Sequence, residues 1–242
     1  MTEPLTPIKL LAACAVMAIG SALQGSAGFG SALVAAPILT LIDPLLVPGP
    51  LLFCALVLTV LMLYRERQAM DISGLKWGIL GRLPGTFVAL VVLTNVPEKE
   101  MMLTLGALVL FAVALSASGM HVNPTMWTLL SAGALSGFMG TTASIGGPPI
   151  ALLYQNAPGA RLRATLSGYF ALGTTMSLLA LAAVGRFGRD EFWSALALLP
   201  GVLIGFALSA RTRQLLDRGY TRAAVLTVSA VSGAIVILRA LL

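Results

Sequence analysis

The chain has 242 residues, of which 58% are apolar and only 10% are charged, whereas soluble domains carry roughly 45–50% apolar and about 25% charged residues. This composition excludes an ordinary water-soluble globule, and the longest charge-bearing connection, residues 211–222, is too short to form a domain outside a membrane. The net charge of +6 comes from cations scattered through short connections, which argues against nucleic-acid binding.

The first long uncharged run, residues 10–42, predicts a broken helix. As one straight helix it would extend roughly 50 Å, but the hydrocarbon core of a bilayer is about 30 Å thick. Helix-breaking glycines lie in its middle, in the sequence GSAGFG of residues 25–30, so we expect two short helices on either side. Peptide groups freed at membrane depth are tolerated where they are buried in protein or line a cavity. The break therefore indicates a candidate site.

Residues 44–64 and 101–120 each fit one membrane-crossing helix, and a further helix between them must contain Arg82. The uncharged run after Arg82, residues 83–97, would reach only about 22 Å, so its helix must extend back past that residue. A cation inside a membrane needs an anionic partner. A substrate anion would fill this role. Two alternatives stay open: an orienting or gating role, and a guanidinium that extends to the inner face beside Lys76.

The second half repeats this pattern. A run over residues 122–160 is interrupted by GTTASIGGPP at 140–149, and single spans are predicted over 164–185, 192–210 and 223–238. A shift of 112 residues aligns 23–41 with 135–153 at six identities in nineteen positions, and a shift of 116 aligns 77–85 with 193–201 at five in nine. We therefore predict a duplication, with a first transmembrane repeat in residues 1–120 and a second in residues 121–242. Chance similarity between runs rich in Gly, Leu and Ala is the alternative.

The distribution of cations predicts how the repeats are oriented. If each broken run returns to the side from which it starts, the connections near 65–76, 155–163 and 211–222 share a face with nine cations, and the other face has five. If each broken run crosses once, the fourteen cations divide equally. The positive-inside rule favours the first arrangement. We expect an all-α polytopic membrane protein with about 8–10 membrane segments and both termini outside. Each inverted-topology repeat would contain a broken or re-entrant helix pair followed by three transmembrane helices.

The two breaks predict an anion site. In inverted repeats with broken helices, half-helix N-termini meet near the midplane, where free N–H groups and the positive end of the helix dipole attract anions. Close packing of small residues between helices is the alternative for any single Gly or Ser. The predicted substrate-binding residues come from both breaks and the buried cation: Gln24, Ser26, Gly28, Phe29, Gly30, Ser31, Arg82, Thr141, Thr142, Ser144, Gly146 and Gly147.

The sequence offers little catalytic apparatus. It shows no nucleophile elbow, metal-binding His pair, P-loop or paired carboxylates, so we predict no enzyme, no cofactor and no metal site. All nine acids lie outside the uncharged runs, which argues against a carboxylate proton relay, and His121 is expected at the surface. The coupling ion, a proton or sodium, stays open, and so does the oligomeric state.

Three stretches carry a resemblance to a known family: GSAGFGSALVAAP at 25–37, GTTASIGGPPIAL at 140–152 and RLPG at 82–85. Together they resemble the TauE/SafE group of sulfite-exporter-like permeases, over nearly the whole chain. The resemblance implies transport of a small anion across the inner membrane: sulfite, an organosulfonate such as sulfoacetate, thiosulfate or a carboxylate. It also implies that the glycine-rich stretches form the substrate region, whereas the role of Arg82 is predicted from its position.

We therefore expect a secondary transporter that exposes a midplane site alternately to each face. Two alternatives stay open. One is a membrane subunit or scaffold without transport of its own. The other is an anion channel, which the sequence does not separate from a carrier.

Overall fold

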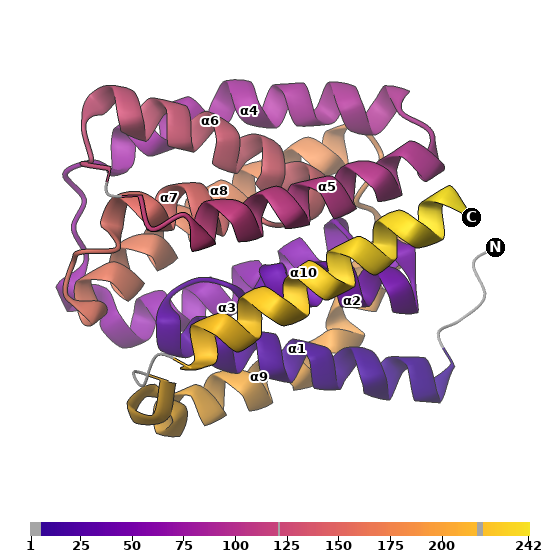
Figure 1. Cartoon of the computed structure of the whole chain (residues 1–242), viewed down its shortest axis with the longest axis horizontal. Helices are drawn as coiled ribbons and strands as arrows, with labels where there is room; N and C mark the ends of the chain where they lie inside the picture. The colour runs from indigo at the N-terminus through magenta and orange to yellow at the C-terminus, as the bar shows by residue number, and fades with distance from the viewer. Residues whose placement is uncertain (1–5, 121, 217–219) are drawn as a thin grey trace.

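The structure is a computed structural model that describes residues 6–120, 122–216 and 220–242, so His121 lies outside the described residues. It forms a bundle of helices (Figure 1), with no strand in the described ranges. Within these ranges the ten α-helices are α1 (Pro7–Ala27), α2 (Ser31–Ile42), α3 (Gly49–Glu66), α4 (Leu75–Asn95), α5 (Glu98–Ala117), α6 (Met126–Ala143), α7 (Gly147–Tyr154), α8 (Gly159–Ala183), α9 (Arg189–Leu216) and α10 (Tyr220–Leu241).

Six helical segments are long and apolar enough to cross a membrane. They are Pro7–Ala27, Pro44–Ala69, Leu75–Asn95, Lys99–Ala117, Gly159–Ala183 and Arg189–Arg211. Two further apolar stretches, Ser31–Ile42 and Val225–Leu241, fall below that length within the residues that were searched, and the second is part of the 22-residue helix α10. The predicted all-α polytopic membrane fold is therefore confirmed. α4 begins at Leu75, so its span does extend back past Arg82.

Both predicted breaks are present. Between α1 and α2, Gly28 and Gly30 have φ angles of 93° and 108°, a left-handed conformation that glycine adopts without steric cost. Between α6 and α7, Ser144 has a φ of 63°, and the N–H of the next residue, Ile145, donates to the carbonyl oxygen of Met139 at 3.2 Å. The expectation of two short helices on either side of each break is wrong for α1. With 21 residues this helix is about 31 Å long, so α2 and α7 are the short members.

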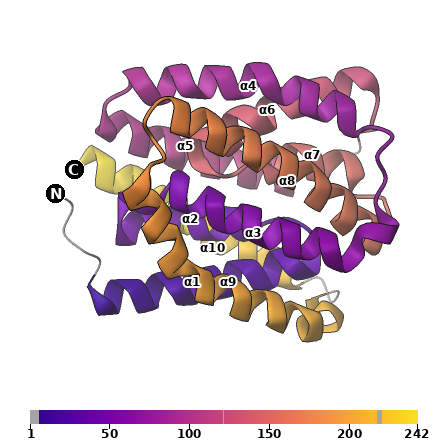
Figure 2. The same cartoon turned by 180° about the vertical axis from the view of Figure 1, so that it is seen from behind.

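Two helix pairs approach most closely, and glycines explain why. A Cβ atom built on Gly85 of α4 would lie 1.9 Å from the carbonyl oxygen of Ala134 in α6. One built on Gly201 of α9 would lie 2.3 Å from the carbonyl oxygen of Cys14 in α1. Each pair lies side by side in both views (Figures 1 and 2). Small residues at these positions let the helix backbones come into contact.

The pairing exchanges helices between the two halves of the chain. α4, the fourth helix of the first half, packs along α6, the first helix of the second half, and α9 packs along α1 in the same way. A duplicated fold predicts this reciprocal exchange. The orientation of the two repeats and the boundary between residues 120 and 121 stay predictions.

The two ends of the bundle differ in the number of cations that their connections carry. α1 begins and α10 ends at one end (Figure 1). At the other end, Asp71 forms an ion pair with Arg161, which joins the connections near 65–76 and 155–163. We call these two connections the cationic face. Hydrogen bonds from Ser73, and then the contact with Arg161, lower the pKa of Asp71 to about 2, so this carboxylate stays ionised at neutral pH.

The expectation that every acid lies outside the spans is wrong for Glu100, Asp190 and Glu191, which lie in the first turns of their helices, and for Glu66. This residue ends α3, and only 8% of its side chain is exposed. A carboxylate is tolerated there because Arg163 Nε lies 3.0 and 2.9 Å from its two oxygens.

Candidate functional site

A small cavity lies where the two breaks come together. Gly30 and Ser31, at the start of α2, form one wall, and Gly146 and Gly147, at the start of α7, form another. Arg82 of α4 completes the polar lining. The cavity holds about 40 Å³ of space for the centres of water molecules. That is room for a few waters or one compact ion.

Arg82 contributes a charged side chain to the cavity lining, and this residue is 1% exposed. Its Nη1 donates to Ser136 Oγ at 3.1 Å and its Nη2 donates to Ser177 Oγ at 3.2 Å. The guanidinium carbon lies 5.6 Å from the centre of the Tyr169 ring. The alternative that this side chain extends to the inner face beside Lys76 is therefore wrong.

No ion pair with a described carboxylate neutralises the charge of Arg82. Among the described residues, no carboxylate forms an ion pair with it, and its Nε is buried without a hydrogen-bond partner. A buried cation without a counter-ion is costly unless a ligand supplies the negative charge. Arg82 therefore brings a positive charge to the cavity lining without a described counter-ion.

Two hydroxyl groups link Arg82 to the surrounding helices. Ser136 accepts from Arg82 and donates to the carbonyl oxygen of Gly146 at 2.6 Å, so one residue connects the cation to the second break. Ser177 lies 2.7 Å from Thr141, which in turn contacts Thr86 at 3.4 Å. α4, α6 and α8 together hold the guanidinium in one position.

Four glycines leave the space that the guanidinium occupies. A Cβ atom on Gly137 would lie 2.9 Å from Arg82 Cγ, one on Gly140 would lie 2.7 Å from Nη2, and one on Gly146 would lie 3.3 Å from Nη1. A Cβ on Gly173 of α8 would lie 2.6 Å from Nε. Substitution at Gly140 or Gly173 would push the guanidinium away from its place, whereas at Gly137 and Gly146 the added Cβ would first meet the backbone oxygens of Arg82 and Ser136.

Gly173→Ala tests this packing. The added methyl group would occupy the space of Arg82 Nε and Cζ, at 2.6 and 2.7 Å, so the guanidinium must move off its serine partners. A charge-assisted hydrogen bond contributes about 1.5–3 kcal/mol, so we expect the apparent affinity for the bound anion to fall by roughly 10- to 100-fold. Isothermal titration calorimetry measures this affinity. Leu172→Ala, on the exposed side of the same helix, is the control, and equal affinities would contradict the prediction.

The two half-helix N-termini contribute unequally. At α2, Gln24 Oε1 accepts a hydrogen bond from Ser31 Oγ, which positions the first turn. The first bond from that turn joins Val34 N–H to the Gly30 carbonyl oxygen, so the N–H groups before it have no partner within the helix. At α7, Pro148 and Pro149 have no N–H to offer. The start of α2 therefore leaves more N–H groups without a partner in the helix than the start of α7 does, and the role of both breaks as anion cradles stays a prediction.

Eight of the twelve predicted site residues line this cavity: Gln24, Phe29, Gly30, Ser31, Arg82, Ser144, Gly146 and Gly147. The other four face elsewhere. Ser26 donates to the Ala22 carbonyl oxygen, Gly28 lies against Arg163, and Thr141 contacts Ser177. Thr142 lines a second cavity. Whether the eight bind a substrate stays a prediction.

Several residues at the site were not predicted from the sequence. Thr59 of α3 and Thr174 of α8 also line the cavity, and Ser136, Gly173 and Ser177 hold Arg82. Gly173 and Ser177 are four residues apart, a spacing that places both on one helix face. That signal is weak, because small residues recur at this spacing wherever membrane helices pack.

A larger cavity of about 530 Å³ lies at the end of the bundle where α1 begins. It reaches from Arg186 and the chain around Pro97 to Pro48 and Thr142. Ser144, which lines the central cavity, donates to the carbonyl oxygen of Pro48 at 3.1 Å. This hydrogen bond joins a residue that lines the central cavity to one that lines the larger cavity.

A family model described as "Sulfite exporter TauE/SafE" matches residues 12–236. No curated protein and no solved structure matches the chain significantly. The matched range includes both breaks, Arg82 and every residue named above as lining the central cavity.

Proposed function

The chain belongs to the TauE/SafE sulfite exporter family, and from that premise we propose that it carries a small sulfur-containing or carboxylate anion through the central cavity. The family is one of membrane transporters, in agreement with the six helices that are apolar and long enough to cross a bilayer. Among the candidate substrates, sulfite is the most compact, and organosulfonates are larger.

The single observation that carries the proposal is the burial of Arg82 without a described counter-ion. Its guanidinium is buried at the cavity, no described carboxylate forms an ion pair with it, and its Nε has no described partner. An oxyanion in the cavity would supply the missing charge and accept hydrogen bonds from the guanidinium. Charge-assisted hydrogen bonds of this kind are about twice as strong as neutral ones.

Alternating access is the proposed mechanism. The breaks bring two non-helical backbone segments to one cavity, and the halves exchange helix partners, as duplicated transporters do. The positive-inside rule would place the cationic face in the cytoplasm of a bacterial inner membrane and both termini in the periplasm. Whether transport is coupled to a proton or to sodium is tested by the flux assay described next.

Flux into proteoliposomes tests the proposal. Purified protein is reconstituted, and uptake of sulfite, sulfoacetate, thiosulfate and acetate is followed with and without proton and sodium gradients. We expect saturable uptake of at least one sulfur oxyanion above that of empty liposomes. Flux that does not saturate would favour a channel. Absence of both flux and anion-dependent thermal stabilisation would favour a subunit without transport activity.

A further inference from the structure

The larger cavity, of about 530 Å³, and the central cavity are lined by the same helices. Gly49, in the first turn of α3, lines the larger cavity, and Leu52, three residues later, lines the central one. Thr40 and Leu33 divide α2 between the two cavities in the same way. Because a helix rises 1.5 Å per residue, the two linings are separated by about one turn of α3.

A side-chain hydrogen bond closes this separation. Ser144 Oγ, at the second break, donates to the carbonyl oxygen of Pro48 at 3.1 Å. The same carbonyl oxygen also accepts from the N–H of Leu52 at 2.9 Å. If Ser144 turned its hydroxyl toward an anion, the Pro48 carbonyl would keep that second bond. The contact can therefore open without leaving a backbone acceptor unpaired.

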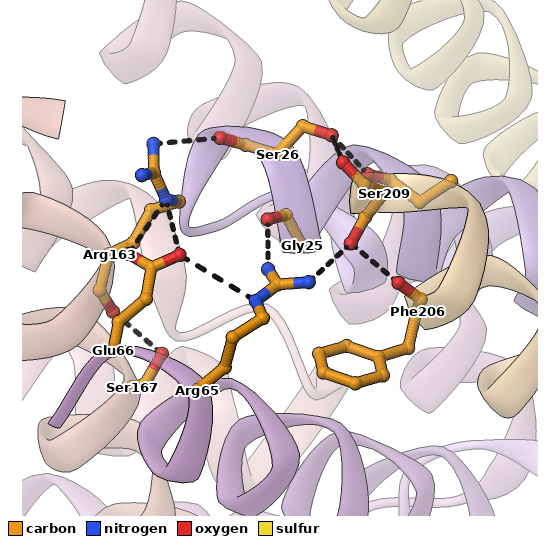
Figure 3. A network of polar contacts seen from close by, with 9 residues as sticks. Gly25, Ser26, Arg65, Glu66, Arg163, Ser167, Phe206 and Ser209 are labelled. Carbon is orange, nitrogen blue, oxygen red and sulfur yellow. Dashed lines mark hydrogen bonds and ion pairs between the residues drawn. The ribbon is translucent and has the colours of Figure 1, made fainter. Parts of the chain in front are cut away.

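Toward the cationic face, the backbone before the first break is held by two arginines (Figure 3). Arg65 Nη2 donates to the carbonyl oxygen of Gly25 at 2.7 Å, and Arg163 Nη1 donates to that of Ser26 at 3.4 Å. Hydrogen bonds from charged donors are about twice as strong as those between neutral groups. The neutral contact between Ser144 and Pro48 is therefore the easier one to open.

Thr142 brings an unused hydroxyl group to the larger cavity. This residue lines the cavity and is 1% exposed, and its Oγ1 has no hydrogen-bond partner among the described residues. A buried hydroxyl without a partner is costly, so a ligand or water molecule is expected to supply one. Ala143 alone separates Thr142 from Ser144 along the chain. The orphan donor is thus two residues from the closing contact.

The charged residues of the larger cavity are already engaged with the backbone. Arg186 Nη2 donates to the carbonyl oxygen of Leu93 at 2.6 Å, and Glu191 Oε2 accepts from the N–H of Gly188 at 2.8 Å. They are one cation and one acid among the described lining residues. Such a lining would pass an anion on, whereas the central cavity has Arg82 to hold it.

We propose that the larger cavity is the vestibule through which a small oxyanion reaches the central cavity from the end where α1 begins, and that the Thr142 hydroxyl donates a hydrogen bond to the passing anion. The inference rests on the proposed transport of an anion. Ser144 exchanges its bond to Pro48 for one to the anion, which is a stronger acceptor because it is charged. The anion thereby opens the contact that it has to cross.

Removal of one hydroxyl tests the contact with Thr142. Thr142→Val keeps the shape of the side chain, and sulfite uptake into proteoliposomes should fall at least about tenfold, the worth of one hydrogen bond to a charged group. The calorimetric affinity for sulfite should stay at the wild-type value, because Thr142 does not line the central cavity. The melting temperature should not fall, because Oγ1 has no described partner to lose.

Two comparisons isolate this hydroxyl. Thr40→Val removes a hydroxyl from the same cavity, but Thr40 Oγ1 already donates to the carbonyl oxygen of Ala36 at 2.8 Å, so this variant should retain more uptake than Thr142→Val. Thr175→Val, at an exposed position outside both cavities, should transport as the wild type does. Equal uptake by Thr142→Val and Thr40→Val, or an equal loss of uptake and of sulfite affinity in Thr142→Val, would overturn the contact.

A bulky label tests the route itself. Leu45 lines the larger cavity and is 54% exposed, so Leu45→Cys can be labelled with fluorescein maleimide in detergent before reconstitution. The parent is Cys14→Ser/Cys54→Ser, in which serine hydroxyls keep the bonds that the thiols donate to α9 carbonyl oxygens. The label should remove most of the sulfite uptake. Leu242→Cys, at the same end of the bundle and outside both cavities, is the labelled control and should keep the uptake of the parent.

The route and the proposed function fail separately. If the wild type carries sulfite, and Thr142→Val and labelled Leu45→Cys carry it as well as their controls do, the vestibule is overturned and transport stands. If the wild type carries none of the tested anions, the proposed function is overturned, and the vestibule with it.

Discussion

Arg82→Ala is expected to abolish anion flux in proteoliposomes while the protein still folds. Removal of one partner from a buried charge pair costs about 3–5 kcal/mol, and each 1.4 kcal/mol corresponds to a tenfold change, so uptake should fall by at least about 100-fold. Alanine also leaves Ser136 and Ser177 facing each other across an empty space. These hydroxyls can be satisfied by water in the cavity, so the melting temperature should change little.

Two companion variants separate charge from shape. Arg82→Lys keeps the positive charge, but a lysine ammonium does not present the planar fork that reaches Ser136 and Ser177 together. We expect partial flux and a raised half-saturating concentration. Lys76→Ala is the control, because this exposed cation of the same helix lies over the Trp77 ring outside the cavity. Equal flux in Arg82→Ala and the wild type would exclude Arg82 as the substrate contact.

Arg82 also shows which features of the site can be predicted from the sequence. The short uncharged run after it requires an intramembrane position, and α4 begins at Leu75 as that argument demands. Its partners Ser136 and Ser177 are 54 and 95 residues away. Serines occur throughout packed membrane helices, so nothing in the sequence distinguishes these two. The position of the charge was predictable, and the residues that hold it were not.

Helix geometry explains why too many residues of the second break were predicted to bind substrate. Successive helical residues turn by about 100°, so a run of neighbours cannot share one face. Gly140 and Ser144, four positions apart, both line the cavity. Thr141 and Thr142, between them, turn toward Ser177 and toward the larger cavity. A motif locates a break in the chain, whereas the helix phase decides which of its side chains reach a ligand.

Glu66 was missed for a different reason. Charged residues were used as markers of span ends, which is sound when each charge must find water by itself. Here the compensating guanidinium of Arg163 comes from a helix 97 residues further along the chain. Tertiary pairing of this kind cannot be inferred from the charge pattern of one helix.

Gly85→Ala is expected to have the largest effect on stability. The new Cβ would lie 1.9 Å from the carbonyl oxygen of Ala134 and 2.7 Å from its carbonyl carbon. Both atoms belong to the α6 backbone, which cannot turn aside as a side chain would, so α4 and α6 must separate. Overpacking in a close-packed interior costs about 1–3 kcal/mol. The resulting fall in melting temperature is about 5–10 °C for a chain of this size, measured by thermal unfolding in detergent.

The same separation should reach the site, because α4 carries Arg82 and α6 carries Ser136, the acceptor of its Nη1. We therefore expect Gly85→Ala to lose anion affinity together with stability. Gly188→Ala is the matched control: its Cβ would meet a single side-chain atom, Glu191 Oε2, at 3.4 Å, which is ordinary contact. If Gly85→Ala melts at the temperature of Gly188→Ala and binds the anion equally well, the close approach of α4 and α6 does not hold the cation in place. Arg82 would then depend on α8 and Gly173 alone for its position.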